Sequence, residues 1–464
     1  MKTRLLGMLF IILLALACLD RREGTVVTYP TIPELVTSDI YSVTVNEQQV
    51  WTEKFRTRMA LDSLPDWFTS EPYTQVQQEV HIANFSGEGP LQIRIEVNEP
   101  IEQAAIRPKS RQLQPTIQGN RLEFTLPGPD KLYLEINHLP PLLFFANPIE
   151  TEQPQPNDPG VRYFGPGVHR PGLMTLAAGE SVYIAGGAIV YGGIRVKGTG
   201  NHRIFGRGIL DGNFQFRRMV LLEDGRDIEF NGVIIRNGRT WTNTIVNCRQ
   251  VRYQEVKVIS FGPGGDGINP LGSQEVTIDH CFLRCTDDCI AIKSPDSSHV
   301  VSDVLVSNNT MVGFAFSDGV TIGFETNGPS VSGVTVRNCD ILIARGGSRV
   351  DGHSAFSVIC DGPAVIRKVL YENIRVEADV LKLFELHITD GTKYGVNPPG
   401  QIQEIHLKNI AWEVPRPIIL HGFDETHLVR DVTFESCTIA DEPLTEMRAD
   451  VFQINPFVVG VRFK

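Results

Sequence analysis

Three aspartates lie in two short segments with residue types suited to acid–base chemistry. Asp266 lies in the segment Gly-Asp-Gly-Ile-Asn-Pro over 265–270, and Asp287 and Asp288 open the segment Asp-Asp-Cys-Ile-Ala-Ile-Lys over 287–293. Carboxyls held close together cannot all ionise without cost, so at least one pKa should rise. A protonated carboxyl can then give its proton to a glycosidic oxygen, while an ionised neighbour takes a proton from water. The two segments therefore predict hydrolysis of a glycosidic bond.

Each segment taken alone has a simpler explanation. An aspartate beside glycine is typical of a tight turn, and a group of surface carboxylates is also able to bind calcium. The combination favours catalysis, because Asp266 and Asp287 are separated by 21 residues and the second segment continues into an apolar run. Whether that separation brings the carboxyls together depends on the fold.

The second half of the chain repeats a pattern of an apolar residue, any residue, an apolar residue and a polar residue. Successive copies start 23 to 36 residues apart, which is typical of a solenoid. A strand–helix–strand crossover needs more residues, and no helical stripe is present. We therefore expect a right-handed parallel β-helix over 160–464, with coils stacked about 4.8 Å apart and Asp266 one coil from Asp287. The copies begin at Ile228, Val251, Val276, Val304, Val334, Val369, Ile405 and Val432.

The region before the repeat predicts a separate all-β domain. Short segments of alternating apolar and polar residues, such as 41–45, 91–97 and 132–136, are separated by turn residues. That alternation favours a small antiparallel β-sandwich over residues 38–150. The chain as a whole is predicted to be all-β, with the β-sandwich preceding the β-helix.

The first 18 residues have the form of an export signal. Lys2 and Arg4 precede an apolar run over 5–17 that is too short to span a bilayer. The run ends in small residues before Cys18, which resembles a bacterial lipoprotein signal in which the cysteine is lipidated. We expect an exported protein that is anchored by lipid to the outer membrane, at the cell surface or in the periplasm, with a tether over 19–37. An ordinary secretory signal on a soluble secreted protein is the alternative.

The composition argues against several classes of protein. The formal net charge is −11, whereas a nucleic-acid groove requires an excess of lysine and arginine. The cysteines form no pair with the spacing that binds zinc, and Cys281, Cys339 and Cys437 fall at one position of the repeat, as stacked core residues would. We expect no metal, cofactor or nucleic acid, and a monomer whose partner is a polysaccharide or oligosaccharide.

The two aspartate segments together resemble the polygalacturonase family, glycoside hydrolase family 28, over about residues 160–380. A β-sandwich ahead of the β-helix is similar to the related dextranase and isopullulanase family, glycoside hydrolase family 49. The resemblance implies an inverting hydrolase of an α-linked polysaccharide. It further implies that Asp287 is the general acid, and that Asp266 and Asp288 activate the water.

The sequence departs from the polygalacturonase pattern at three motifs. The family's Asn-Thr-Asp is Gly-Gly-Asp over 264–266, and its Gly-His-Gly falls near Ser-Asp-Gly over 317–319. Asp318 or His353 would then take the place of the missing histidine. The family's Arg-Ile-Lys best matches Arg-Val-Asp over 349–351, so that Arg349 keeps the cation and Asp351 replaces the lysine.

The last departure bears on the substrate. The family's basic pair grips a uronate carboxylate, whereas Arg349 with Asp351 is neutral overall and suits hydroxyls, or forms a structural salt bridge. The resemblance therefore implies a neutral or differently substituted glycan. A true polygalacturonase acting on pectin, a β-helix polysaccharide lyase and a carbohydrate-binding solenoid without catalysis are the alternatives. The expected substrate-binding residues are Arg349, Asp318, Lys293, Glu325, His353 and Asp351.

Three of these candidates also have plain structural explanations. Lys293 follows a predicted strand, so it could either supply the missing cation or be a solvated rim residue. Glu325 could line the cleft on the next coil or be a solvated loop carboxylate. His353 could replace the family histidine from a later coil or lie on a surface loop.

Overall fold

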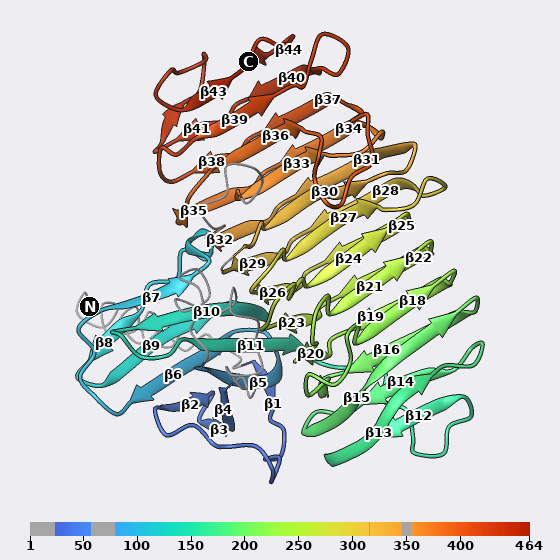
Figure 1. The fold of residues 1–464 in the computed structure, drawn as a ribbon. Helices are drawn as coiled ribbons and strands as arrows, with labels where there is room; N and C mark the ends of the chain where they lie inside the picture. The colour runs from blue at the N-terminus through green and yellow to red at the C-terminus, as the bar shows by residue number, and fades with distance from the viewer. Residues whose placement is uncertain (1–23, 57–78, 315, 346–353) are drawn as a thin grey trace, which may run out of the picture.

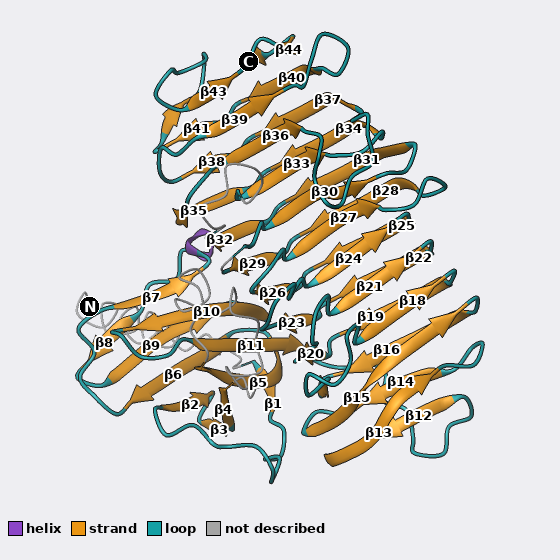
Figure 2. Cartoon of the chain, viewed as in Figure 1, coloured by secondary structure: helices purple, strands orange, loops and turns teal. Residues whose placement is uncertain are grey.

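The computed structural model describes residues 24–56, 79–314, 316–345 and 354–464. They form a β-sandwich beside the N-terminal half of a right-handed parallel β-helix (Figure 1). Within these residues the one helical element is the 3-10 turn η3 (Lys109–Arg111), and the chain is otherwise strands and loops (Figure 2). No helix in this part of the chain is long and apolar enough to cross a bilayer. The predicted all-β class is confirmed.

The repeated pattern forms one ladder of parallel strands. Its eight copies pair in register from Ile228 to Val432, each with the next, so the predicted repeat is the coil of the β-helix. Their apolar residues are buried and their polar residues face outward, which fixes the register. The ladder runs through β12 (Val161–Phe164), β14 (Ser181–Ile184), β16 (Gly200–Gly206), β19 (Arg226–Asn231), β22 (Arg249–Gln254), β25 (Gln274–Asp279), β28 (Val300–Ser307), β31 (Ser330–Arg337), β34 (Val365–Glu372), β37 (Gln401–Lys408) and β40 (Val429–Glu435), with β44 (Val458–Val459) and β45 (Arg462–Phe463) both against β40.

Two further ladders complete each coil. The second is covered by the β-sandwich over part of its length, and the third carries the candidate site at its start. The second comprises β17 (Ile209–Asp211), β20 (Ile234–Arg236), β23 (Lys257–Ile259), β26 (Phe282–Cys285), β29 (Thr310–Gly313), β32 (Asp340–Ala344), β35 (Arg375–Val380), β38 (Ala411–Trp412) and β41 (Thr438–Ile439), with β42 (Glu442–Pro443) antiparallel to β41. The third comprises β13 (Gly167–Thr175), β15 (Ala188–Lys197), β18 (Val220–Glu223), β21 (Asn243–Val246), β24 (Ile268–Leu271), β27 (Ile290–Ser294), β30 (Val320–Thr326), β33 (Phe356–Cys360), β36 (Phe384–Ile388), β39 (Ile418–His421) and β43 (Phe452–Ile454).

The interior of the β-helix is apolar along its whole length. Stacked valine, isoleucine and phenylalanine side chains from the three ladders form one continuous buried cluster. Cys281, Cys339 and Cys437 belong to it, as the repeat predicted, and all seven described cysteines are buried and free of disulfides. This rigid core fixes the height of each coil, and with it the spacing of the residues at the coil corners.

The N-terminal domain consists of two facing sheets, as the alternation predicted. Its strands are mostly antiparallel, but β11 and β5 pair in parallel. One sheet contains β1 (Thr25–Val27), β4 (Thr52–Arg56), β5 (Glu79–Glu88), β7 (Ala104–Arg107), β10 (Asp130–Ile136) and β11 (Leu142–Pro148). The other contains β2 (Tyr41–Val45), β3 (Gln48–Val50), β6 (Leu91–Val97), β8 (Thr116–Gln118) and β9 (Arg121–Leu126).

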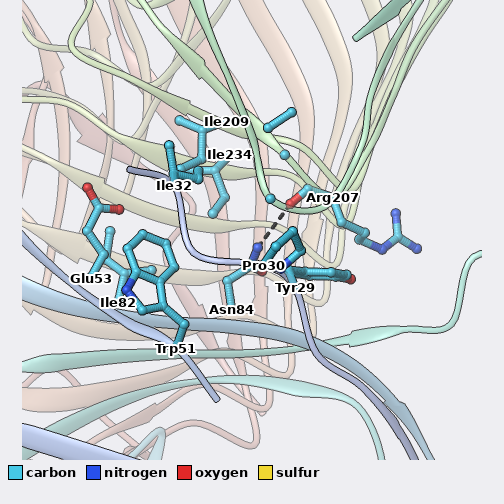
Figure 3. Close-up of a pocket in the computed structure, with 13 residues that line it drawn as sticks. Tyr29, Pro30, Ile32, Trp51, Glu53, Ile82, Asn84, Arg207, Ile209 and Ile234 are labelled. Carbon is cyan, nitrogen blue, oxygen red and sulfur yellow. Dashed lines mark hydrogen bonds between the residues drawn. The ribbon is translucent and has the colours of Figure 1, made fainter. Parts of the chain in front are cut away.

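The predicted tether is partly wrong, because part of it is folded. Thr25–Val27 form β1 and pair with β5, and Ile32 is buried against the β-helix. Figure 3 shows this segment, with Ile32 close to Ile209 and Ile234, Tyr29 near Arg207, and Asn84 Nδ2 donating to the Arg207 carbonyl at 2.9 Å. Burial of Ile32 favours packing over a free tether.

Apolar and charged contacts join the two domains. The rings of Phe145 and Phe282 lie 5.2 Å apart, edge to face. Buried Arg236 donates to Glu53 of β4 at 2.8 Å and to Asp211 at 2.8 Å. A buried guanidinium with two carboxylates is costly to break, so the β-sandwich is fixed rigidly to the second ladder. The turns that lead to the third ladder lie at the edge of this contact.

Candidate active site

The candidate site is a column of residues at one corner of successive coils. Asp266, Asp288 and Asp318 each lie two residues before a strand of the third ladder, and the first residues of those strands are paired. Main-chain hydrogen bonds of 2.9 Å run from Gly267 to Asp288 and from Cys289 to Asp318, so the stacking continues through the corner. The predicted one-coil spacing is confirmed, with Asp288 rather than Asp287 at the position equivalent to Asp266. In coil order, the equivalent positions are Arg218, Trp241, Asp266, Asp288, Asp318, Ser354, Lys382 and Arg416.

Glycine at this corner allows the coils to approach closely. A Cβ at position 265 would lie 2.4 Å from Thr286 Oγ1, and one at position 267 would lie 2.4 Å from the Cys289 carbonyl oxygen. No real side chain tolerates such distances, so the Gly-Asp-Gly segment is required by stacking as well as by chemistry. Close packing of the coils therefore accounts for the two glycines beside Asp266.

Asp266 is buried, with one strong hydrogen-bond donor. Its side chain is 3% exposed, and Asn269 Nδ2 donates to its Oδ2 at 2.7 Å. Burial raises the pKa of Asp266 to about 6, against the opposing effects of the Lys293 charge and of the Asn269 hydrogen bond. At neutral pH this carboxyl is ionised, as a base that accepts a proton from water must be.

Asp287 and Asp288 differ in their access to solvent and in their donors. Asp287 is half-buried, whereas Asp288 is 9% exposed and accepts a 3.0 Å hydrogen bond at Oδ1 from the Asp318 amide. The Asp288 amide donates to Oδ1 of Asp287 at 3.1 Å. Burial, followed by the charge of Asp266, raises the pKa of Asp287 well above its ordinary value. Burial and the charges of Asp287 and Asp318 do the same for the pKa of Asp288.

Asp318 lies behind the other carboxyls. It is 1% exposed, and its own oxygens accept hydrogen bonds from the Ser354 amide at 2.6 Å and from the Ser357 hydroxyl. Burial raises the pKa of Asp318 to about 7, and the Ser357 hydrogen bond and the Lys382 charge oppose the shift. We expected Asp318 to bind substrate, but this burial fits a residue that acts on Asp288 and Asp287 from below.

Lys293 and Glu325 form a buried ion pair next to Asp266. Lys293 is 5% exposed, so it is not a solvated rim residue, and its Nζ donates to Glu325 at 2.7 Å and to the Gly323 carbonyl at 3.4 Å. A bulge in β30 opposite Lys293 brings Glu325 to this position, so Glu325 is not a free loop carboxylate. Burial disfavours the lysine charge, but Glu325 and Asp266 hold the pKa of Lys293 above its ordinary value.

Trp241 and Arg218 belong to the same column, and our sequence analysis missed them as site residues. Cζ of Arg218 lies 4.0 Å from the centre of the Trp241 ring, and Nζ of Lys293 lies 5.2 Å from it. Both residues lie two positions before a strand of the third ladder, as Asp266 does. That offset from each strand is the sequence signal that could have found them. Our sequence analysis located the site by its aspartate segments, and neither Arg218 nor Trp241 lies in one of them.

Four predicted residues cannot be placed. Arg349, Asp351 and His353 lie outside the described residues, as does Cys18. The roles expected for them remain predictions.

The corner holds three carboxyls with raised pKa values, Asp266, Asp287 and Asp288, of which Asp287 is the most accessible to solvent. An ion-paired lysine, Lys293, lies beside them. Such a set fits acid–base hydrolysis of a glycosidic bond. The fold and the site together define a parallel β-helix protein with a cluster of buried carboxyls at one corner of its coils.

The chain belongs to glycosyl hydrolases family 28, whose model matches residues 179–420, just over half of the sequence. The probable exopolygalacturonase B of Aspergillus flavus is 24% identical over an alignment of 205 positions that covers 38% of this chain and 45% of that protein. The endo-polygalacturonase of Pectobacterium carotovorum subsp. carotovorum is 27% identical over 167 residues, 36% of this chain and 38% of that protein. The matches thus span less than half the length of these relatives.

Solved structures show the same fold over a larger part of the chain. Dex49A from Penicillium minioluteum has a TM-score of 0.65 at 16% identity, covering 94% of this chain and 96% of that one. An exopolygalacturonase from Thermotoga maritima has a TM-score of 0.52 at 15% identity, covering 65% of this chain and 83% of that one. The expected likeness to a dextranase in overall layout agrees with the first of these.

Proposed function

We propose that this chain is an inverting glycoside hydrolase in which Asp287 is the general acid and Asp266 and Asp288 activate the water. The observation that carries the proposal is the difference in exposure between half-buried Asp287 and the two buried carboxyls. Asp266 accepts from Asn269 and Asp288 accepts from the Asp318 amide, and such donors favour the ionised form. Asp287 is the most exposed of the three carboxyls, which suits a proton donor that faces substrate.

For the substrate, we propose an α-linked polysaccharide other than plain polygalacturonate, either neutral or differently substituted. The support is the sequence at the family's uronate clamp, where Asp351 stands in place of a lysine. A true polygalacturonase is the second candidate, because the relatives named above are polygalacturonases. A lyase is less well supported, since Lys293 is committed to Glu325 and the column is rich in acids.

We also propose that the protein is exported and held at a membrane by a lipid on Cys18. The support is the charged start, the apolar run and the small residues before the cysteine. Metabolic labelling with a fatty acid in a bacterial host, with Cys18→Ser as control, tests this: label that persists in the serine variant would contradict it.

The activity itself is tested by incubating the purified protein with pectins, dextrans, pullulan and algal galactans. We expect new reducing ends from at least one α-linked polysaccharide and no ultraviolet-absorbing unsaturated product. A product with a new double bond would replace the hydrolase by a lyase. Failure to release reducing ends from any of these polysaccharides would contradict the proposal.

A further inference from the structure

Arg218 stands in the active-site column two coils before Asp266. It precedes β18 by two residues, as Trp241 precedes β21 and Asp266 precedes β24. Coils stack about 4.8 Å apart, so the guanidinium arises from a backbone position about 10 Å along the axis from that of Asp266. A glycan that lies along the column over the acids would therefore extend over Arg218 or away from it.

The surroundings of Arg218 differ from those of two nearby lysines, Lys293 and Lys382. Lys293 pairs with Glu325 and Lys382 pairs with Glu385, each at 2.7 Å. Among the described residues, no carboxylate lies within ion-pair distance of Arg218. Its Nη1 donates to the Thr244 hydroxyl at 3.3 Å. Burial, and next the neighbouring charge of Arg217, lower the pKa of Arg218, although a guanidinium stays charged.

Trp241 fixes the orientation of this charge. The guanidinium carbon lies 4.0 Å from the ring centre, close enough for a cation–π contact that holds a flexible side chain in one place. Trp241 is itself half-buried, at the position equivalent to Asp266. A planar guanidinium that is positioned before its ligand arrives loses little freedom on binding an anion.

The turns around Arg218 carry further positive charge. Arg217 and Arg239 are both exposed, and their turns are joined because the Arg239 amide donates to the Phe216 carbonyl at 3.2 Å. This end of the column is thus basic, whereas Asp266, Asp288 and Asp318 make the next three positions acidic. An anionic group would be attracted to the arginines and repelled by the acids, which sets its position along the axis.

We propose that Arg218, held by Trp241, binds an anionic substituent of the glycan, a carboxylate or a sulfate ester, on the sugars that lie toward the N-terminal coils. The inference rests on the proposed function only in requiring that a glycan lies along the column. It adds a charge-specific subsite at residues outside the motifs that mark the family resemblance. The substituent is held away from the reacting bond, so the subsite is compatible with the loss of the uronate clamp at Asp351.

The test is a binding measurement on the Asp287→Asn protein, which should bind glycans without cutting them. Calorimetry would compare oligogalacturonate with its methyl ester, and a sulfated carrageenan oligosaccharide with a neutral agar oligosaccharide. We expect one anionic member to bind more tightly than its neutral counterpart, and added Arg218→Gln to weaken that binding by about tenfold or more. Binding of the neutral members should change less than twofold.

The matched control is Arg217→Gln, which removes the same charge one residue away on an exposed side chain. Arg217→Gln should lower the affinity for the anionic ligand by less than threefold, since the Arg217 side chain does not contact Trp241 in the way that Arg218 does. Arg218→Lys keeps the charge without the planar fork and should recover part of the affinity. Melting temperatures of the variants show that each is folded.

Several results would overturn the inference. Equal affinity for charged and neutral partners would do so, as would equal losses in Arg217→Gln and Arg218→Gln, or no detectable binding of either anionic glycan. The proposed hydrolase activity is scored separately, on the unmodified Asp287 enzyme. Cleavage of a neutral glycan alone would leave the hydrolase standing and remove the anionic subsite. Charge-selective binding without any cleavage would do the reverse.

Discussion

The main-chain amide of Asp318 donates a 3.0 Å hydrogen bond to Oδ1 of Asp288, so a residue with almost no exposure acts on the carboxyl above it. The bond favours the ionised form of Asp288, while the charge on the Asp318 side chain raises the pKa values of Asp287 and Asp288. The backbone and the side chain of one residue therefore have opposite effects. This relationship underlies several of the outcomes expected below.

Asp287→Asn should lower hydrolysis by about two to four orders of magnitude, because the amide keeps the shape but cannot give a proton to the leaving oxygen. The measurement is release of reducing ends from the best substrate. Asp303→Asn, an exposed change on the first ladder, is the control and should stay within twofold of the parent. Activity of Asp287→Asn within threefold of the parent would remove Asp287 from the mechanism.

Hydrolysis should invert the anomeric configuration. If Asp266 and Asp288 activate a water, the donor and base carboxyls must leave room for it, which in inverting enzymes means about 6.5–9.5 Å between them. An NMR time course on fresh product should show the anomer opposite to that of the bond cut. First appearance of the retained anomer, or a trapped glycosyl-enzyme, would contradict the proposed roles.

The pH dependence of kcat/KM should be bell-shaped, with a lower limb near pH 6. Below that value Asp266, whose pKa is about 6, takes up a proton and no longer acts as a base. At high pH the raised pKa of Asp287 is finally passed, and the acid is lost. Rates measured from pH 4 to 10 give both limbs.

Asp318→Asn should move the upper limb and leave the lower limb in place. The substitution removes a negative charge that raises the pKa of Asp287, so the acid should ionise at a lower pH than in the parent. The lower limb should stay in place because burial, the Lys293 charge and the Asn269 hydrogen bond have the largest effects on the pKa of Asp266. A uniform loss of rate with both limbs unchanged would mean that Asp318 only supports the fold.

Asp351→Lys should raise activity on polygalacturonate relative to the parent, which we expect to be poor on this substrate. Two unit charges about 4 Å apart repel by about 4 kcal/mol at an effective dielectric constant of 20, before solvent reduces the effect. Initial rates on polygalacturonate and on its methyl ester measure the change. Efficient cleavage of polygalacturonate by the parent would contradict the expectation, and Lys293 would be the first candidate for the cation that binds the uronate.

The spacing between copies of the repeat and the alternation of apolar residues within each copy were sufficient to predict the β-helix and its register. Each coil needs apolar residues pointing inward at alternate positions. The sequence from Ile228 to Val432 meets this need locally in every copy of the repeat, so the pattern can be recognised without the structure. The same logic placed Asp266 one coil from Asp287, and the strand register stacks Asp266 with the adjacent Asp288. The β-sandwich followed from the same alternation.

The properties of the site, in contrast, depend on contacts between coils. Burial gives Asp266 a pKa of about 6, and the bulge in β30 brings Glu325 onto Lys293, although nothing in the spacing of 293 and 325 indicates a pair. The packing of Ile32 against the β-helix was likewise not predicted, because its segment is polar, contains prolines and resembles a tether.

Sequence alone thus determined which residues are repeated, and the tertiary structure decided which side chains meet. Arg218 and Trp241 illustrate the reason. They are separated from Asp266 by 48 and 25 residues, distances set by turn lengths that differ from coil to coil, so no fixed spacing marks them. Only the pairing of Val220 with Asn243 and of Asn243 with Ile268 aligns the three corners in one column, because strand register, rather than distance along the chain, fixes neighbours in a solenoid.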